Sequence, residues 1–74
     1  MKLYTKTVCP KCLWVKSELE RAGIQYEMIN IDQNEQAKEQ IIEAGYFSVP
    51  VLEINHQLIG EVEQILAKIE LVAQ

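Results

Sequence analysis

The order of short apolar segments along the chain is the feature that most constrains its fold. Strand-like segments are predicted at residues 2–5, 24–31, 51–54 and 58–60, and helix-like segments at residues 10–22, 32–44 and 61–72. This βαβαββα order fits one small domain spanning residues 1–74. The first two helical connections are long enough to return parallel strands, and the last two strands form an antiparallel hairpin. The sequence therefore predicts an α/β fold with a four-stranded mixed sheet flanked by three helices on both faces.

Local signals set the expected ends of these segments. Gly23 is predicted to end the first helix. The second helix is expected to begin at Asp32, with Glu35 completing a capping box, or to use Asn34 as its cap instead. The strand at residues 24–31 ends in an apolar run, which predicts burial on both of its faces.

Charge is distributed unevenly along the chain. The first 17 residues hold four lysines and no acid, and the remaining 57 hold three basic and eleven acidic residues, giving +4 and −8 within a net charge of −4. The acidic balance argues against nucleic-acid binding, and no segment reaches the ~20 apolar residues of a membrane span. The N-terminus lacks the apolar run of a signal peptide. Since the chain has only two cysteines, three positions apart, we expect a cytoplasmic protein that uses its thiols for redox chemistry or metal binding.

The motif Cys9-Pro10-Lys11-Cys12 falls where the first strand ends and the first helix begins. A thiol there faces unpaired backbone N–H groups and the positive end of the helix dipole, which both stabilise a thiolate. Pro10 suits the first helical position, where its missing N–H costs nothing. Cys12 follows about one turn later, close enough to form a disulfide with Cys9. Zinc is disfavoured because it takes about four ligands and His56 is the only other obvious nitrogen or sulfur donor.

Three stretches of the chain, in this order, resemble the glutaredoxin branch of the thioredoxin superfamily. They are Tyr4-Thr5-Lys6-Thr7-Val8-Cys9-Pro10-Lys11-Cys12, then Ser48-Val49-Pro50-Val51, then Asn55 with Leu58-Ile59-Gly60. The resemblance covers essentially the whole chain and implies a thioredoxin-like fold with dithiol–disulfide oxidoreductase activity. It makes Cys9 the exposed nucleophile that forms a mixed disulfide, and Cys12 the half-buried thiol that resolves it.

The resemblance also implies supporting residues around the dithiol. Lys6 matches a lysine that helps to stabilise the thiolate, although a solvated lysine at a strand end is the competing interpretation. Lys11 stands where glutaredoxins commonly carry an aromatic residue, so a positive charge replaces an apolar surface beside Cys9. Pro50 resembles the cis-proline of the superfamily, and Val49 would offer its main chain to an extended substrate.

The pair Gly60-Glu61 departs from the glutaredoxin pattern. Glutathione-using members usually carry Gly-Gly here, and the glycyl carboxylate of glutathione lies on the N-terminus of the last helix. The carboxylate of Glu61 would repel that anion by about 2–3 kcal/mol at an effective dielectric of ~20 and a separation of ~6–8 Å, before salt screening. Glutathione binding is then expected to weaken by about one to two orders of magnitude, unless Glu61 points to solvent.

Together these features predict a monomeric cytoplasmic oxidoreductase without a bound cofactor, which reduces protein or low-molecular-weight disulfides. Its expected reductant is thioredoxin reductase, which Glu61 favours, or glutathione as co-substrate. One alternative is a module in which Cys9 and glutathione bind an iron–sulfur cluster between two protomers. A purely structural or interaction domain is the other, if Cys9 proves unreactive. Neither a nucleic acid nor a membrane is expected as a partner.

Four further side chains have predicted positions. Trp14 is predicted at the rim of the active site or against a neighbouring loop. His56 is predicted in a hairpin turn opposite the dithiol, with no catalytic role. Tyr46 and Phe47 are predicted to belong to the core rather than to contact substrate.

Overall fold

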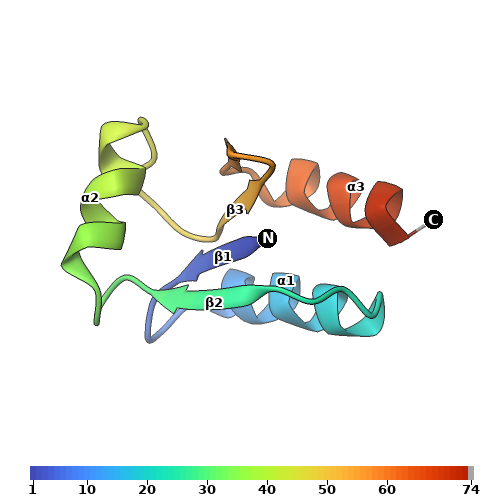
Figure 1. The fold of residues 1–74 in the computed structure, drawn as a ribbon. Helices are drawn as coiled ribbons and strands as arrows, with labels where there is room; N and C mark the ends of the chain where they lie inside the picture. The colour runs from blue at the N-terminus through green and yellow to red at the C-terminus, as the bar shows by residue number, and fades with distance from the viewer. Residues whose placement is uncertain (74) are drawn as a thin grey trace.

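A four-stranded mixed sheet lies between two layers of helices in the computed structural model, which describes residues 1–73 (Figure 1). The strands are β1 (Lys2–Thr5), β2 (Glu27–Asn30), β3 (Val51–Ile54) and β4 (Gln57–Ile59), and the helices are α1 (Pro10–Arg21), α2 (Glu35–Glu43) and α3 (Val62–Ala73). The sheet order β2-β1-β3-β4 places β2 and β4 at the edges. The predicted fold class, element order and β3–β4 hairpin are confirmed.

The direction of β3 differs from the prediction. β1 and β2 are parallel, with Thr5 opposite Asn30, but β3 runs antiparallel to β1, with Val51 opposite Tyr4. β3 therefore begins at the end of the sheet where β2 finishes. The prediction of a parallel strand after the second helix was wrong because α2 runs across the direction of the strands rather than back along them (Figure 1). Residues 44–50 therefore enter β3 at the end of the sheet where β2 finishes.

Two separate cores attach the helices to opposite faces of the sheet. Leu3 and Tyr4 of β1 point to opposite faces, as expected for neighbours on a strand. The core under α1 and α3 consists of Leu3, Val15, Leu19, Leu52, Ile65 and Ile69. The core under α2 consists of Tyr4, Ala37, Ile41 and Val51. The helices thus cover both faces, with α2 alone on one of them.

Two local expectations need correction. β2 is an edge strand rather than a strand buried on both faces, and its Met28 is 50% exposed. The N-cap of α2 is Asn34, whose Oδ1 accepts a hydrogen bond from the backbone N–H of Ala37 at 3.1 Å. Asn34 was the alternative cap, and the capping box from Asp32 to Glu35 was wrong. The carboxylate of Asp32 contacts the loop before α1 instead.

Candidate active site

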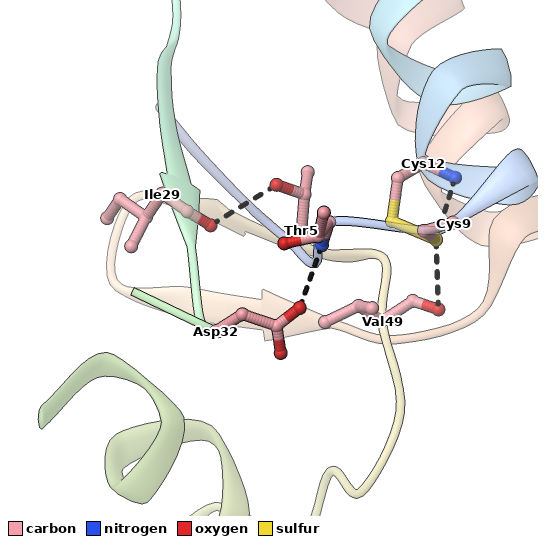
Figure 2. The surroundings of a disulfide bond; sticks show 7 residues. Thr5, Cys9, Cys12, Ile29, Asp32 and Val49 are labelled. Atoms are coloured by element: carbon pink, nitrogen blue, oxygen red, sulfur yellow. Dashed lines mark hydrogen bonds between the residues drawn. A yellow bond between two sulfur atoms is a disulfide. The ribbon is translucent and has the colours of Figure 1, made fainter. Parts of the chain in front are cut away.

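Cys9 and Cys12 form a disulfide at the N-terminus of α1, with their Cα atoms 5.2 Å apart (Figure 2). Cys9 is the N-cap of the helix, in an extended conformation, and its Sγ accepts a hydrogen bond from the backbone N–H of Cys12 at 3.1 Å. Pro10 occupies the first position of the helix, as predicted. The Cys9 sulfur therefore lies at the positive end of the α1 dipole, where a thiolate is stabilised.

Both cysteines are buried in this disulfide form. Cys9 is 9% exposed and Cys12 is 4% exposed, so the expected order is kept, but the expectation of an exposed Cys9 was wrong. The Sγ of Cys9 is turned toward Cys12 and lies 3.9 Å from the carbonyl oxygen of Val49, whose loop covers it (Figure 2). Cys12 lies on the same face of α1 as the buried Val15.

The Val49–Pro50 peptide bond is cis, as predicted. Pro50 is buried and Val49 is half-buried, directly before β3 begins at Val51. Because the Val49 carbonyl lies beside the Cys9 sulfur, the main chain of this loop is adjacent to the disulfide. An extended peptide that reached Cys9 would meet that main chain.

A polar network ties the loop before Cys9 to the end of β2. The carboxylate of Asp32 accepts a hydrogen bond from the backbone N–H of Thr7 at 2.9 Å (Figure 2). The Nδ2 of Asn30 donates to Thr7 Oγ1 at 3.4 Å, and its Oδ1 accepts from the Asp32 N–H at 2.9 Å. The hydrogen bonds from Thr7, aided by the charges of Lys38 and Lys6, lower the pKa of Asp32.

The sequence reasoning missed this role of Asp32. Asn30 stands at the end of a strand, and its Oδ1 accepts the N–H two residues on in an Asx turn, which brings Asp32 beside the loop before α1. In the sequence, Asp32 fits the start of the following helix equally well, and that pattern predicted a capping role for it.

Two grooves flank the disulfide. The first, which we call the β2 groove, has a volume of about 470 Å³, and its lining includes Cys9, Cys12, Lys6, Lys16, Leu13 and Met28. The second, which we call the proline groove, has a volume of about 430 Å³, and its lining includes Lys11, Trp14, Val49, Pro50, Gly60 and Glu61. The proline groove thus brings together five predicted site residues, while Lys6 lies in the β2 groove. Trp14 is 53% exposed and lines the proline groove, in agreement with a place at the rim.

Gly60 and Tyr46 pack tightly where β4 leads into α3. A Cβ on Gly60 would collide with the ring of Tyr46, whose hydroxyl donates to the carbonyl oxygen of Leu58 at 2.8 Å. Tyr46 also packs against the core under α2, as predicted. The same prediction was wrong for Phe47, which is 82% exposed.

Glu61 is exposed and lies immediately before α3, where its carbonyl oxygen accepts from the N–H of Ile65 at 2.9 Å. Glu63, in the first turn of α3, is also exposed and lines the proline groove. Two exposed carboxylates therefore lie at the N-terminal end of α3.

His56 lies in the β3–β4 turn with φ of 67°, at the end of the sheet away from the disulfide, as predicted. Within residues 1–73, no group of three or more His, Cys, Asp or Glu side chains is arranged to hold a metal ion. Over the same residues, no helix has the length and apolar character needed to cross a membrane.

Comparison with known proteins gives one consistent result. A family model described as Glutaredoxin matches residues 1–59. Glutaredoxin 3 of Escherichia coli K12 is 32% identical over 68 residues, covering 90% of this chain and 82% of its own length. The glutaredoxin-like protein NrdH of Lactococcus lactis subsp. lactis IL1403 is 36% identical over 50 residues, covering 68% of this chain and 69% of its own.

Solved structures agree with these sequence matches. The glutaredoxin-like NrdH-redoxin of Escherichia coli superposes with a TM-score of 0.79 and 27% identity, covering 86% of this chain and 87% of its own. A wheat glutaredoxin superposes with a TM-score of 0.81 and 26% identity, covering 97% of this chain and 74% of its own.

Proposed function

The chain belongs to the glutaredoxin family, and from this premise we propose that it is a dithiol–disulfide oxidoreductase acting on protein or low-molecular-weight disulfides. The observation that carries the proposal is the position of Cys9, which caps α1, accepts the Cys12 N–H and forms a disulfide with Cys12. The same helix end that stabilises a Cys9 thiolate therefore also holds its resolving partner.

In the proposed reaction the dithiol form passes two electrons to the substrate. The Cys9 thiolate attacks one sulfur of a substrate disulfide, and the other substrate sulfur leaves as a thiolate. The Cys12 thiolate then attacks the Sγ of Cys9, so the Cys9–Cys12 disulfide forms and the second substrate thiolate leaves. Each departing thiolate takes up a proton from solvent. The deeper burial of Cys12, on the inner face of α1, supports its role as the resolving thiol.

Single cysteine variants test these roles. Cys9→Ser is expected to abolish reduction of a disulfide substrate, because no nucleophile remains at the helix end. Cys12→Ser is expected to accumulate a mixed disulfide between Cys9 and substrate, measured by intact mass spectrometry after acid quenching. Equal alkylation rates of the two thiols in the reduced protein would contradict the assignment.

We further propose that a flavin-dependent thioredoxin reductase is the preferred reductant. Glu61 and Glu63 line the proline groove at the start of α3, and their charges oppose a bound carboxylate there. The related NrdH-redoxin of Escherichia coli is described as having a thioredoxin-like activity profile. Both Glu61 and Glu63 are exposed, so solvent screening reduces the repulsion below its unscreened value.

Paired turnover assays test the choice of reductant. The wild-type protein is expected to turn over faster with thioredoxin reductase than with glutathione and glutathione reductase. Glu61→Gly is expected to raise the glutathione-dependent rate about three- to tenfold, because one exposed charge is removed from the anion position. Glu39→Gln on α2 removes an equal charge elsewhere and serves as the control. Efficient glutathione turnover by the wild-type protein would overturn this choice.

We also propose that the protein acts as a cytoplasmic monomer without a resident cofactor. The iron–sulfur alternative would place glutathione in the proline groove, where Glu61 opposes it. Anaerobic purification tests the two possibilities. A colourless monomer by sedimentation is expected, whereas a coloured dimer containing iron and sulfide would favour the cluster.

A further inference from the structure

The two grooves beside the disulfide carry opposite charge. The lining of the β2 groove contains Lys6 and Lys16 and no carboxylate. The lining of the proline groove contains Lys11 together with Glu61 and Glu63. An acidic peptide segment is therefore attracted to the β2 groove and repelled from the proline groove.

Lys16 is free to meet a ligand. It lies on α1 one turn after Cys12 and is half-buried in the wall of the β2 groove. Across residues 1–73 the only ion pair within 4.0 Å joins Arg21 to Glu18, so no carboxylate of this part of the chain neutralises Lys16 at that distance.

One carboxylate does lie close enough for Lys6 to affect it. Asp32 has its pKa lowered in part by the charge of Lys6, but its carboxylate already accepts the Thr7 N–H at 2.9 Å. Asp32 is not part of the lining of the β2 groove. Lys16 lies further along α1, and its positive charge is therefore available to interact with a bound partner.

Exposed apolar side chains accompany these charges. Leu13 of α1 is 64% exposed and Met28 of β2 is 50% exposed, and both line the β2 groove. β2 is an edge strand, so one side of its backbone is unpaired within the sheet. Apolar contacts beside unpaired cations suit an extended acidic peptide better than a small anion.

We propose that the β2 groove binds an acidic segment next to the reacting cysteine of a disulfide-bonded protein substrate. The inference rests on the proposed function and adds a substrate class to it. The substrate cysteine faces Cys9, its acidic flank lies toward Lys16, and its other flank lies along the main chain of Val49. Cys9 bonds to the cysteine of the acidic segment while the partner sulfur of that cysteine leaves as a thiolate.

Single-turnover reduction of model peptides tests the inference. Three disulfide-bridged peptides of equal length carry Asp, Asn or Lys at the same positions beside one cysteine, and each is mixed with the pre-reduced protein. Free thiols are counted by alkylation after acid quenching. At low salt the Asp peptide is expected to react about three- to tenfold faster than the Asn peptide, and the Lys peptide more slowly than either. The differences are expected to shrink at high salt.

Charge reversal of one lysine locates the effect. The preference is measured within each variant as the ratio of the Asp-peptide rate to the Asn-peptide rate, which cancels any change in the reactivity of the dithiol itself. Lys16→Glu is expected to bring this ratio to one or below, and Lys16→Gln is expected to give a ratio between those of Lys16→Glu and the wild type. Lys68→Glu, an equal charge change on the exposed face of α3, is expected to keep the preference. Thermal melts monitored by circular dichroism show that the variants fold.

The possible failures are distinguishable. If the wild-type protein reduces none of the three peptides, the proposed function itself fails. If it reduces all three at equal rates, or if Lys68→Glu removes the preference as fully as Lys16→Glu does, the inference fails while the oxidoreductase function stands.

Discussion

The carboxylate of Asp32 fixes the loop that carries the reactive cysteine. It accepts the N–H of Thr7, two residues before Cys9, and Asn30 holds the hydroxyl of the same threonine. The loop between β1 and α1 is thereby tied to the end of β2, which is its neighbour in the sheet. Hydrogen bonds to the ionised carboxylate favour that form, which is why the pKa of Asp32 is lowered.

The lowered pKa of Asp32 predicts a pH-dependent contribution to stability. Because the folded-state pKa lies below the unfolded value of about 3.8, this contribution is complete above that pH and is lost as the pH falls through the folded-state pKa. Asp32→Asn is therefore expected to lower the free energy of unfolding near neutral pH and to have little effect near pH 2. Urea denaturation at both pH values measures the difference. A deficit of equal size at both pH values would contradict the role of the charge.

Residues whose chemistry follows from local spacing were predictable. The Cys9–Cys12 pair and Pro10 at the helix start were predicted from spacing, whereas the cis bond at Pro50 was predicted only from the resemblance to glutaredoxins. Phe47 was not, because an apolar residue in a loop gives no periodic signal to say whether it packs inward. The burial of Cys9 depends on the loop at residues 47–50, which lies about forty positions away.

At the scale of the elements, α2 has a sharply defined beginning. Asn34 has an extended backbone, with φ of −144°, and its side chain accepts the N–H of Ala37. Without that bond one of the four free N–H groups at the helix start would depend on solvent alone. α2 contributes only Ala37 and Ile41 to its core, so its cap matters more than it would in a better-buried helix.

Removal of the cap is expected to destabilise the protein modestly. Asn34→Ala should lower the free energy of unfolding by about 1 kcal/mol, because the Ala37 N–H loses its partner and alanine is a poor N-cap. Chemical denaturation at neutral pH measures the loss. Gln36→Ala, in the first turn of the same helix and exposed, is the control and should change stability far less. Equal losses for both substitutions would contradict the capping role.

The elements themselves followed from periodicity, but their placement did not. A largely apolar segment such as residues 28–31 is compatible with either a buried strand or an edge strand, because the difference depends on which strands pair beside it. The direction of β3 depends on where residues 44–50 return the chain, which no pattern within a single segment records.

At the scale of the whole molecule, the two faces of the sheet are covered by cores of unequal size. The core under α1 and α3 unites six buried side chains from two helices and two strands. The core under α2 has four, and α2 is the only helix on that face. The dithiol stands at the end of α1, on the better-packed side.

This asymmetry predicts an order of local opening. Backbone amides of α2 are expected to exchange with solvent deuterium faster than those in the middle of α1 and α3, because fewer buried side chains must separate. Native-state hydrogen exchange followed by NMR measures the three helices in one sample. The same order is expected in the reduced protein, since the disulfide closes only one turn of α1. Slower exchange in α2 than in α1 would contradict the view that the size of the core under each helix sets its local stability.

The hairpin turn at Asn55 and His56 lies at the opposite end of the sheet from Cys9. Both residues have exposed side chains and positive φ values, and neither faces the two grooves. A surface linker attached through the His56 side chain would therefore immobilise the protein without obstructing the dithiol. The attachment point and the reactive sulfur then lie at opposite ends of the sheet.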